Sequence, residues 1–199
     1  MPAQPPHAAV FLDKDGTIIE DVPYSVDPNQ MRLLIGAAAG LRLVHEAGYR
    51  LVVVSNQSGV ARGYFPEAAL EVVRQRLEAM LDDLGVPLSG FYYCPHHPAG
   101  VVPGYTQSCE CRKPKAGLVW KACRDLGIDP VKSWLIGDTL DDVEAGRRAG
   151  CRTVWITAAH PAAIAPAASP LISSWRRPHL QAPDLAQAAR LLLARGREP

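Results

Sequence analysis

The sequence has no long apolar run and no excess of charge of either sign. Its 199 residues contain 21 Lys and Arg against 20 Asp and Glu, which leaves a net charge of +1. This balance gives no electrostatic reason to expect a nucleic-acid or membrane partner. No apolar stretch approaches the roughly 18 residues of a membrane-spanning helix, and the first six residues lack the basic and apolar regions of a signal peptide. We therefore expect a cytoplasmic protein.

Signs of a disulfide framework and of internal repeats are also missing. The chain has five cysteines, an odd number, so metal binding or burial is the better expectation for them. No segment repeats along the chain. The composition, 48% apolar and 21% charged, is ordinary for a globular protein. We expect a single domain over residues 1–199, acting as a monomer.

Short apolar runs alternate with amphipathic segments over most of the chain. The expected strands are 8–12, 50–54, 91–94, 134–136 and 152–156, and the expected helices are 37–47, 66–84, 118–126, 141–149 and 184–194. This alternation predicts an α/β fold, doubly wound around a mainly parallel sheet with helices on both faces. Residues 158–183, rich in Ala, Pro and Ser, lack such a pattern and predict an irregular arm.

Polar residues directly follow three of the predicted strands. These are residues 13–15 (Asp-Lys-Asp), 55–56 (Ser-Asn) and 137–138 (Gly-Asp). In an open α/β sheet, ligands bind beyond the carboxyl ends of the strands. The sequence therefore predicts that these side chains converge on one site at one edge of the sheet.

The first of these segments, D-K-D-G-T at residues 13–17, carries two carboxylates separated by one residue. Asp13 can act as a nucleophile and metal ligand while Asp15 acts as the acid and base. Gly16 permits a tight turn that exposes backbone N–H groups to an anion. A solvated turn is the alternative, since Asp and Gly favour turns. The position directly after an apolar strand favours a functional site.

The other polar positions are less specific when taken alone. Ser55 could bind a phosphate oxygen and Lys113 could neutralise a phosphoryl group, although Ser-Asn turns and Lys-Pro pairs are common on ordinary surfaces. Asp138 would join Asp13 on a hard cation, for which Mg²⁺ is the natural candidate. For Asp142 we favour a charge in the first turn of a helix, with no part in the site.

Taken in order, the motifs D-x-D-G-T, S-N, K and G-D resemble the haloacid dehalogenase (HAD) superfamily of phosphatases. The resemblance covers residues 8–157, the expected catalytic core, and implies a Mg²⁺-dependent reaction through an aspartyl-phosphate intermediate. The chain has no large insertion between the motifs, so we expect no large cap domain. The catalytic residues implied by the resemblance are Asp13, Asp15, Ser55 and Lys113, and the implied Mg²⁺ ligands are Asp13, Asp15 and Asp138.

Two tight pairs of soft ligands occur in the segment 94–111. Their members are Cys94, His96, Cys109 and Cys111. Thiolates with an imidazole select Zn²⁺ in a closed tetrahedral site, which leaves no position for water or substrate. Such a zinc would be structural and would hold a loop without its own core just before Lys113. His97 is the alternative to His96 as the histidine ligand. The alternative to a zinc site is that these are four unrelated residues in a Pro-rich loop.

The segments D-K-D-G-T-I, S-N-Q-S-G-V-A-R-G and C-R-K-P further resemble one branch of that superfamily. Its members remove the C7 phosphate of D-glycero-D-manno-heptose 1,7-bisphosphate during synthesis of lipopolysaccharide or surface-sugar precursors. The substrate contacts implied by this resemblance are Asp21, Tyr24, Ser55, Asn56, Gln57, Ser58, Arg112 and Lys113. Arg112 is the best candidate to bind the phosphate that is not cleaved, because a planar guanidinium suits it, and Arg62 is a weaker one.

Other functions are alternatives to this one. Histidinol-phosphate phosphatases share most of these motifs, including the zinc loop. A non-catalytic zinc-loop module is disfavoured, because the acidic residues and the lysine of the phosphatase pattern are all present. Repair of nucleic-acid ends is disfavoured by the neutral net charge. The substrate we expect is therefore a small sugar bisphosphate.

Overall fold

A computed structural model describes residues 7–158 and 173–195. Six parallel strands form one sheet in the order β3-β2-β1-β4-β5-β6. The strands are β1 (Ala9–Leu12), β2 (Arg50–Asn56), β3 (Gly90–Cys94), β4 (Trp134–Gly137), β5 (Arg152–Ile156) and β6 (Leu180–Ala182). The α-helices are α1 (Ala37–Glu46), α2 (Ala69–Asp82), α3 (Gly117–Leu126), α4 (Leu140–Ala149) and α6 (Leu185–Arg195). The predicted fold class is confirmed.

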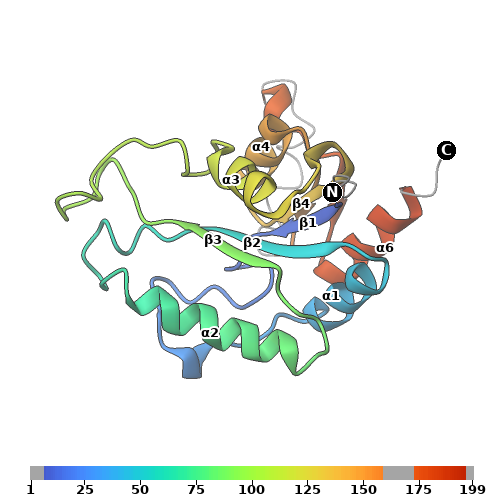
Figure 1. Cartoon of the computed structure of the whole chain (residues 1–199), viewed down its shortest axis with the longest axis horizontal. Helices are drawn as coiled ribbons and strands as arrows, with labels where there is room; N and C mark the ends of the chain where they lie inside the picture. The colour runs from blue at the N-terminus through green and yellow to red at the C-terminus, as the bar shows by residue number, and fades with distance from the viewer. Residues whose placement is uncertain (1–6, 159–172, 196–199) are drawn as a thin grey trace, which may run out of the picture.

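Helices cover both faces of the sheet (Figure 1). On one face lie α1, α2 and α6, and on the other lie α3 and α4. The side chains of β1 alternate between the two layers, since Val10 and Leu12 belong to the first core and Ala9 and Phe11 to the second. All four are fully buried, as expected for a parallel strand with helices on either side. The sheet is therefore a rigid support for whatever follows its strands.

The register of the central strands aligns their carboxyl ends. Leu12, the last residue of β1, pairs with Val53 of β2 and with Ile136 of β4. The chain continues the β1 to β4 pairing for one more step, because the Asp13 N–H donates to the carbonyl oxygen of Ile136 at 3.0 Å. The polar residues after these strands are thereby brought to the same edge, as the sequence predicts.

The prediction of an irregular arm at 158–183 is partly wrong. Residues 174–176 form a short 3₁₀ helix, η4, and residues 180–182 form the edge strand β6. A strand of three residues after Pro178 is too short to produce a hydrophobic period, which explains why the pattern did not reveal it. The part of this segment at 159–172 lies outside the described residues. The terminal helix is confirmed within one residue at each end.

Loops rather than a second layer border the open edge of the sheet. Within residues 7–158 and 173–195, no large cap domain stands over it, in agreement with the prediction. The long segment between β3 and α3, which contains the predicted zinc ligands, extends beyond the end of the sheet (Figure 1). In the same described ranges, no helix has the length and apolar character needed to cross a membrane.

Candidate active site

An open cleft of about 390 Å³ lies at the carboxyl ends of β1, β2 and β4. It is lined by residues from the loops that follow these strands and from the segment that precedes α3. The predicted catalytic, magnesium-binding and substrate-binding residues all line it, namely Asp13, Asp15, Asp21, Tyr24, Ser55, Asn56, Gln57, Ser58, Arg112, Lys113 and Asp138. Residues from five separate parts of the sequence therefore meet in one place.

Asp13 and Lys113 form the centre of the cleft floor. The ammonium group of Lys113 donates to Asp13 Oδ1 at 2.7 Å and to the carbonyl oxygen of Val54 at 2.8 Å. The backbone of Lys113 is fixed as well, because its N–H and C=O bond to the side-chain amide of Asn56 at 3.0 and 3.1 Å. Only 3% of Lys113 is exposed. A cation is thus held at a fixed position beside the expected nucleophile.

Asp142 takes part in this site through Lys113, although we expected only a charge in the first turn of a helix. It does sit in the first turn of α4, where it forms a capping box with Thr139. Its side chain is nevertheless fully buried, and Asp142 Oδ1 lies 2.5 Å from the Lys113 ammonium group. Sequence position alone cannot distinguish the two cases, since an acidic residue in a first turn looks the same whether it faces solvent or a buried lysine.

Three carboxylates crowd together under the cleft. Oxygen atoms of Asp13, Asp138 and Asp142 all lie within 4.8 Å of one another. Burial, followed by the charges of the neighbouring acidic residues, raises the pKa of Asp13 to about 8, and Lys113 offsets this only in part. The single positive charge of Lys113 is paired with two of these groups, Asp13 and Asp142. An all-oxygen donor set with this excess of negative charge fits a hard divalent cation such as Mg²⁺.

The turn after β1 brings the backbone against one of these carboxylates. Gly16 has a φ of +76°, and a Cβ added there would lie 2.4 Å from Asp138 Oδ2. Any other residue would be strained at this φ and would displace the Asp138 carboxylate. The glycine of the D-x-D-G-T motif therefore allows the first motif and the strand end of β4 to approach one another.

Asp15 is held apart from the three-carboxylate group. Its Oδ1 pairs with the ammonium group of Lys14, and its Oδ2 accepts from the Gln57 amide at 3.1 Å. The same amide nitrogen donates to Ser55 Oγ at 2.8 Å. The structure thus brings Asp142 rather than Asp15 into the group of acidic oxygens, and the role of Asp15 as a magnesium ligand stays a prediction.

An aromatic pair forms part of the cleft rim. Tyr24 lines the cleft, and its ring contacts the ring of Tyr64 edge-on with centroids 4.5 Å apart. Tyr24 has a φ of +57°, a conformation that is uncommon for a residue with a side chain. Residues with such backbone strain cluster at binding sites, where the surrounding structure holds them in place. The position of Tyr24 is consistent with its predicted contact to substrate.

The four predicted zinc ligands meet beside the cleft. Their Sγ atoms are 3.2 to 3.5 Å apart, and His96 Nδ1 lies 3.3 Å from Cys111 Sγ and 3.8 Å from Cys94 Sγ. These separations are close to the roughly 3.8 Å edge of a tetrahedron with zinc–sulfur bonds of about 2.3 Å. None of the cysteines in the described residues forms a disulfide. The donor set and its spacing fit a structural Zn²⁺.

His97, the competing imidazole, is outside this cluster. Its Nδ1 accepts from the Ala99 N–H at 3.0 Å, and its Nε2 lies 3.1 Å from the guanidinium of Arg62. Burial, together with the charges of Arg112 and Arg62, lowers the pKa of His97. Arg62 does not line the cleft, whereas Arg112 does and lies 3.5 Å from the carbonyl oxygen of His96.

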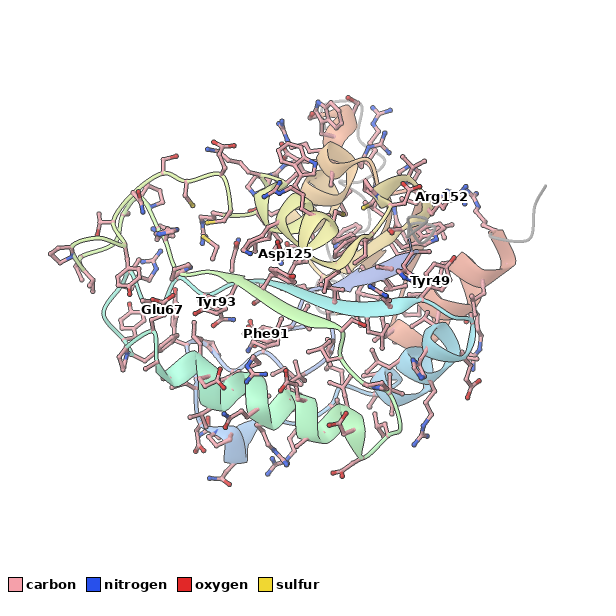
Figure 2. All side chains as sticks on the ribbon, in the orientation of Figure 1. Tyr49, Glu67, Phe91, Tyr93, Asp125 and Arg152 are labelled. Atoms are coloured by element: carbon pink, nitrogen blue, oxygen red, sulfur yellow. The ribbon has the colours of Figure 1, made fainter. Side chains whose placement is uncertain are left out.

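The segment that carries these ligands is also anchored to the start of α2. Figure 2 shows Glu67 and Tyr93 lying close together. The Tyr93 hydroxyl donates to Glu67 Oε1 at 3.0 Å, and the Tyr105 hydroxyl donates to Glu67 Oε2 at 2.6 Å. Because Tyr105 lies between the two ligand pairs, Glu67 ties the middle of the loop to the body of the protein.

Comparison with known proteins identifies relatives of this chain among the HAD-like phosphatases. The HAD-hydrolase-like family model matches residues 110–188. The D-glycero-beta-D-manno-heptose-1,7-bisphosphate 7-phosphatase of Haemophilus ducreyi is 45% identical over 146 residues, which cover 73% of this chain and 80% of that protein. The enzyme of the same name from Escherichia coli strain K12 is 42% identical over 145 residues, covering 73% of this chain and 76% of its own.

Solved structures with the same fold include one assigned to the HAD-like phosphatases and one named as a heptose bisphosphate phosphatase. A HAD-like phosphatase from Mesorhizobium loti superposes with a TM-score of 0.80 at 32% identity, covering 96% of this chain and 87% of its own. The D,D-heptose 1,7-bisphosphate phosphatase of B. bronchiseptica, complexed with magnesium and phosphate, has a TM-score of 0.77 at 27% identity, covering 94% and 99%. On this sequence and structural similarity, the chain belongs to the D-glycero-beta-D-manno-heptose-1,7-bisphosphate 7-phosphatase family of HAD-like phosphatases.

Proposed function

We propose that this enzyme hydrolyses the C7 phosphate of D-glycero-β-D-manno-heptose 1,7-bisphosphate, as a step in the synthesis of heptose-containing surface sugars. The observation that carries the proposal is the convergence of Asp13, Lys113 and Asp138 at the strand ends of a chain whose relatives bear this name. The β configuration at C1 is taken from the names of those relatives. Histidinol phosphate is the alternative substrate.

Asp13 is the proposed nucleophile. One carboxylate oxygen attacks phosphorus in line with the sugar C7 oxygen, forming an aspartyl phosphate as the phosphorus–oxygen bond to the sugar breaks. Asp15 supplies the proton for the departing sugar oxygen and then accepts a proton from the water that attacks the aspartyl phosphate. Lys113 keeps its positive charge beside the transferring group, because Asp13 and Asp142 raise its pKa in spite of its burial. Ser55 binds a phosphate oxygen.

Asp13 and Asp138 are the proposed magnesium ligands within the cleft, and Asp15 is a further candidate. The bound cation would neutralise the phosphate and the crowded carboxylates. A divalent charge would also favour the carboxylate form of Asp13, which is the form that attacks phosphorus. Asp142 lies behind Lys113 and does not line the cleft, so we assign it to the orientation of that lysine.

The second phosphate is assigned to Arg112. This side chain lines the cleft, and its guanidinium has a long contact to the carbonyl oxygen of His96, at 3.5 Å. The adjacent residues Cys111 and Lys113 belong to the zinc cluster and to the catalytic centre. We therefore propose a structural Zn²⁺ on Cys94, His96, Cys109 and Cys111, whose task is to fix the position of residues 112 and 113.

A comparison of kcat/KM over a small panel of substrates tests the function. The panel contains the β and α anomers of the heptose 1,7-bisphosphate, the heptose 1-phosphate and histidinol phosphate. We expect the highest efficiency on the β-bisphosphate, with phosphate released from C7 and no release from the 1-phosphate. A higher efficiency on histidinol phosphate would overturn the proposed substrate while leaving the phosphatase chemistry in place.

A further inference from the structure

Lys14, the middle residue of D-K-D, is a buried cation with no part in the chemistry described above. Only 2% of it is exposed, and it borders a small hollow. The lining of this hollow includes the apolar residues Ile19, Met31 and Val73 and the acidic residues Asp15, Glu20 and Asp27. A charged ammonium is costly in such surroundings unless it is paired. Its ion-pair partner is Asp15 Oδ1. The lysine therefore approaches the expected acid and base from the protein side, away from the substrate.

Gln57 holds the other oxygen of the same carboxylate. Its amide nitrogen carries two hydrogens, one directed at Asp15 Oδ2 and one at Ser55 Oγ. The backbone of Gln57 is fixed in turn, since its N–H donates to the carbonyl oxygen of Cys94 at 2.8 Å. Gln57 thus connects the expected acid and base to the residue expected to bind a phosphate oxygen.

Two anchors on the two oxygens determine the orientation of the Asp15 carboxylate. The side chain has two rotatable bonds, and each anchor comes from a group that is itself more than nine-tenths buried. The Asp15 side chain is 30% exposed, and Asp15 lines the cleft as well as the small hollow beside Lys14. A carboxylate without these anchors would rotate among several conformers, of which few place an oxygen beside the leaving group.

We propose that Lys14 and Gln57 act as a clamp that positions Asp15 for proton transfer to the leaving oxygen. The inference rests on the proposed function, because it takes Asp15 as the acid and base. As the phosphorus–oxygen bond breaks, its electron pair passes to the sugar oxygen, which takes the proton from the protonated Asp15 carboxyl. This leaves Asp15 as the carboxylate that pairs with Lys14. The new bond from Asp13 to phosphorus forms in the same step. The clamp affects the proton transfer and not the attack by Asp13.

This division gives the clamp a kinetic signature. A sugar oxygen is a basic leaving group that needs a proton, whereas nitrophenolate leaves readily without one. Lys14→Met should lower kcat for the heptose bisphosphate by about 100-fold, near the lower end of general-acid effects. It should lower kcat for p-nitrophenyl phosphate by less than about fivefold, with KM for the bisphosphate little changed. Measuring each variant at its own pH optimum removes changes of protonation from the comparison.

Three further variants control the experiment. Lys14→Arg keeps a cation at the position and should recover most of the activity. Val73→Ala removes packing from the same hollow without touching the ion pair, and should change both substrates equally. Gln57→Met keeps the length of the side chain without its donors. Because the Gln57 amide also donates to Ser55, this variant should lower kcat for both substrates, but by a clearly larger factor for the heptose bisphosphate than for p-nitrophenyl phosphate. That difference carries the test if Lys14→Met does not fold.

Asp15→Asn separates failure of the clamp from failure of the proposed function. If Asp15→Asn shows the selective loss and both Lys14→Met and Gln57→Met lower the two substrates equally, the clamp is overturned and the role of Asp15 stands. If Asp15→Asn itself lowers the two substrates equally, Asp15 is not the acid and base, and the proposed mechanism and the clamp both fail.

Discussion

The cleft and the zinc-ligand cluster are two groups of candidate metal ligands, joined through residues 111–113, yet they are built in different ways. Asp13 and Asp138 follow the buried central strands β1 and β4, and Asp142 lies beneath them in the first turn of α4. All three carboxylates are buried. The thiols and imidazole of the cluster lie mainly on the long segment between β3 and α3, outside the three-carboxylate core. The fold therefore fixes the positions of the carboxylates. In the zinc-ligand cluster, a bound metal would instead fix the conformation of residues 94–111.

This difference predicts what each metal does. Removal of the cation from the cleft leaves the sheet and its strand ends in place, so the fold persists and the chemistry stops. Removal of zinc from the cluster should loosen the loop. Its other ties to the body of the protein include the two hydrogen bonds to Glu67 and those from the Val101 and Val102 N–H groups to the carbonyl oxygen of Ala61. Chemistry and architecture should therefore respond separately to changes in the two groups.

The largest effect is expected for the nucleophile. Asp13→Asn should lower turnover by about 10⁴-fold or more, because an amide cannot form the phosphoryl bond. The fold should be retained, since Asn has nearly the size and shape of Asp and Lys113 keeps its ion pair with Asp142. Steady-state phosphate release and circular dichroism on the same samples measure the two quantities. Phosphate release near the wild-type rate would show that Asp13 is not the nucleophile. Loss of the fold would contradict the expectation that the sheet holds the cleft in place without the Asp13 carboxylate.

The matching change in the other group is Cys109→Ser. We expect about one tightly held zinc per chain in the wild type and a marked loss in the variant. The free energy of unfolding should fall by several kcal/mol, part of the roughly 10–16 kcal/mol that zinc binding contributes in small zinc sites. Elemental analysis and denaturant unfolding provide the measurements. Limited proteolysis should produce new cleavage within residues 94–111.

Two results would contradict this expectation. The first is wild-type protein, prepared without chelators and under reducing conditions, that is active and holds no zinc. The second is a Cys109→Ser protein with unchanged stability. Cys123→Ser is a suitable control, because this cysteine lies on α3 outside the cluster.

Arg112 connects the two groups, and its removal should give an intermediate effect. If Arg112 binds the phosphate that is not cleaved, Arg112→Ala should lower kcat/KM more for the bisphosphate than for a monophosphate that carries only the cleaved phosphate. The expected difference is about 10- to 150-fold, the range for one charge-assisted contact. Lys113→Ala should lower both equally, since it touches the transferring phosphate. Equal losses in Arg112→Ala would assign Arg112 to the catalytic phosphate or to the loop, and Arg62 would then be tested.

The smallest effect concerns stability and pH in the magnesium-free protein. Burial and the neighbouring acids raise the pKa of Asp13 to about 8, so the folded state holds this proton more tightly than the unfolded chain. The free energy of unfolding should then fall as the pH rises from about 4 to about 8. Asp13→Asn lacks the group, and its Tm should decline less than the wild-type Tm over this window. Parallel pH dependences for the two proteins would contradict the assigned shift.

Much of the site was predictable because strand ends converge in a parallel sheet. The motifs after β1, β2 and β4 predict that Asp13, Ser55 and Asp138 share one edge, and this is the arrangement found. The zinc-ligand cluster was predictable for another reason, since soft ligands at short spacing are rare by chance. In both cases the residue type and its local context were sufficient.

The residues that were missed depend on contacts distant in the sequence. Asp142 could not be assigned, because its burial depends on a lysine 29 positions earlier, and nothing in the first turn of α4 indicates this. The middle residue of D-K-D gave no local sign that it lies beneath Asp15. The strand β6 was missed because three residues carry no measurable period. Local sequence patterns identify the ends of strands. Which charged side chains are buried can be seen only from the folded structure.

The most direct test of the account is to look for the phosphorylated enzyme itself. Wild-type protein mixed with the heptose bisphosphate and Mg²⁺, then quenched in acid within one turnover, should carry one phosphoryl group on the peptide that contains Asp13. The bond should be cleaved by hydroxylamine, as expected of an acyl phosphate, and Asp13→Asn should show none. Phosphate release with no phosphorylated peptide at any quench time, or with the phosphoryl group on another residue, would contradict the central claim.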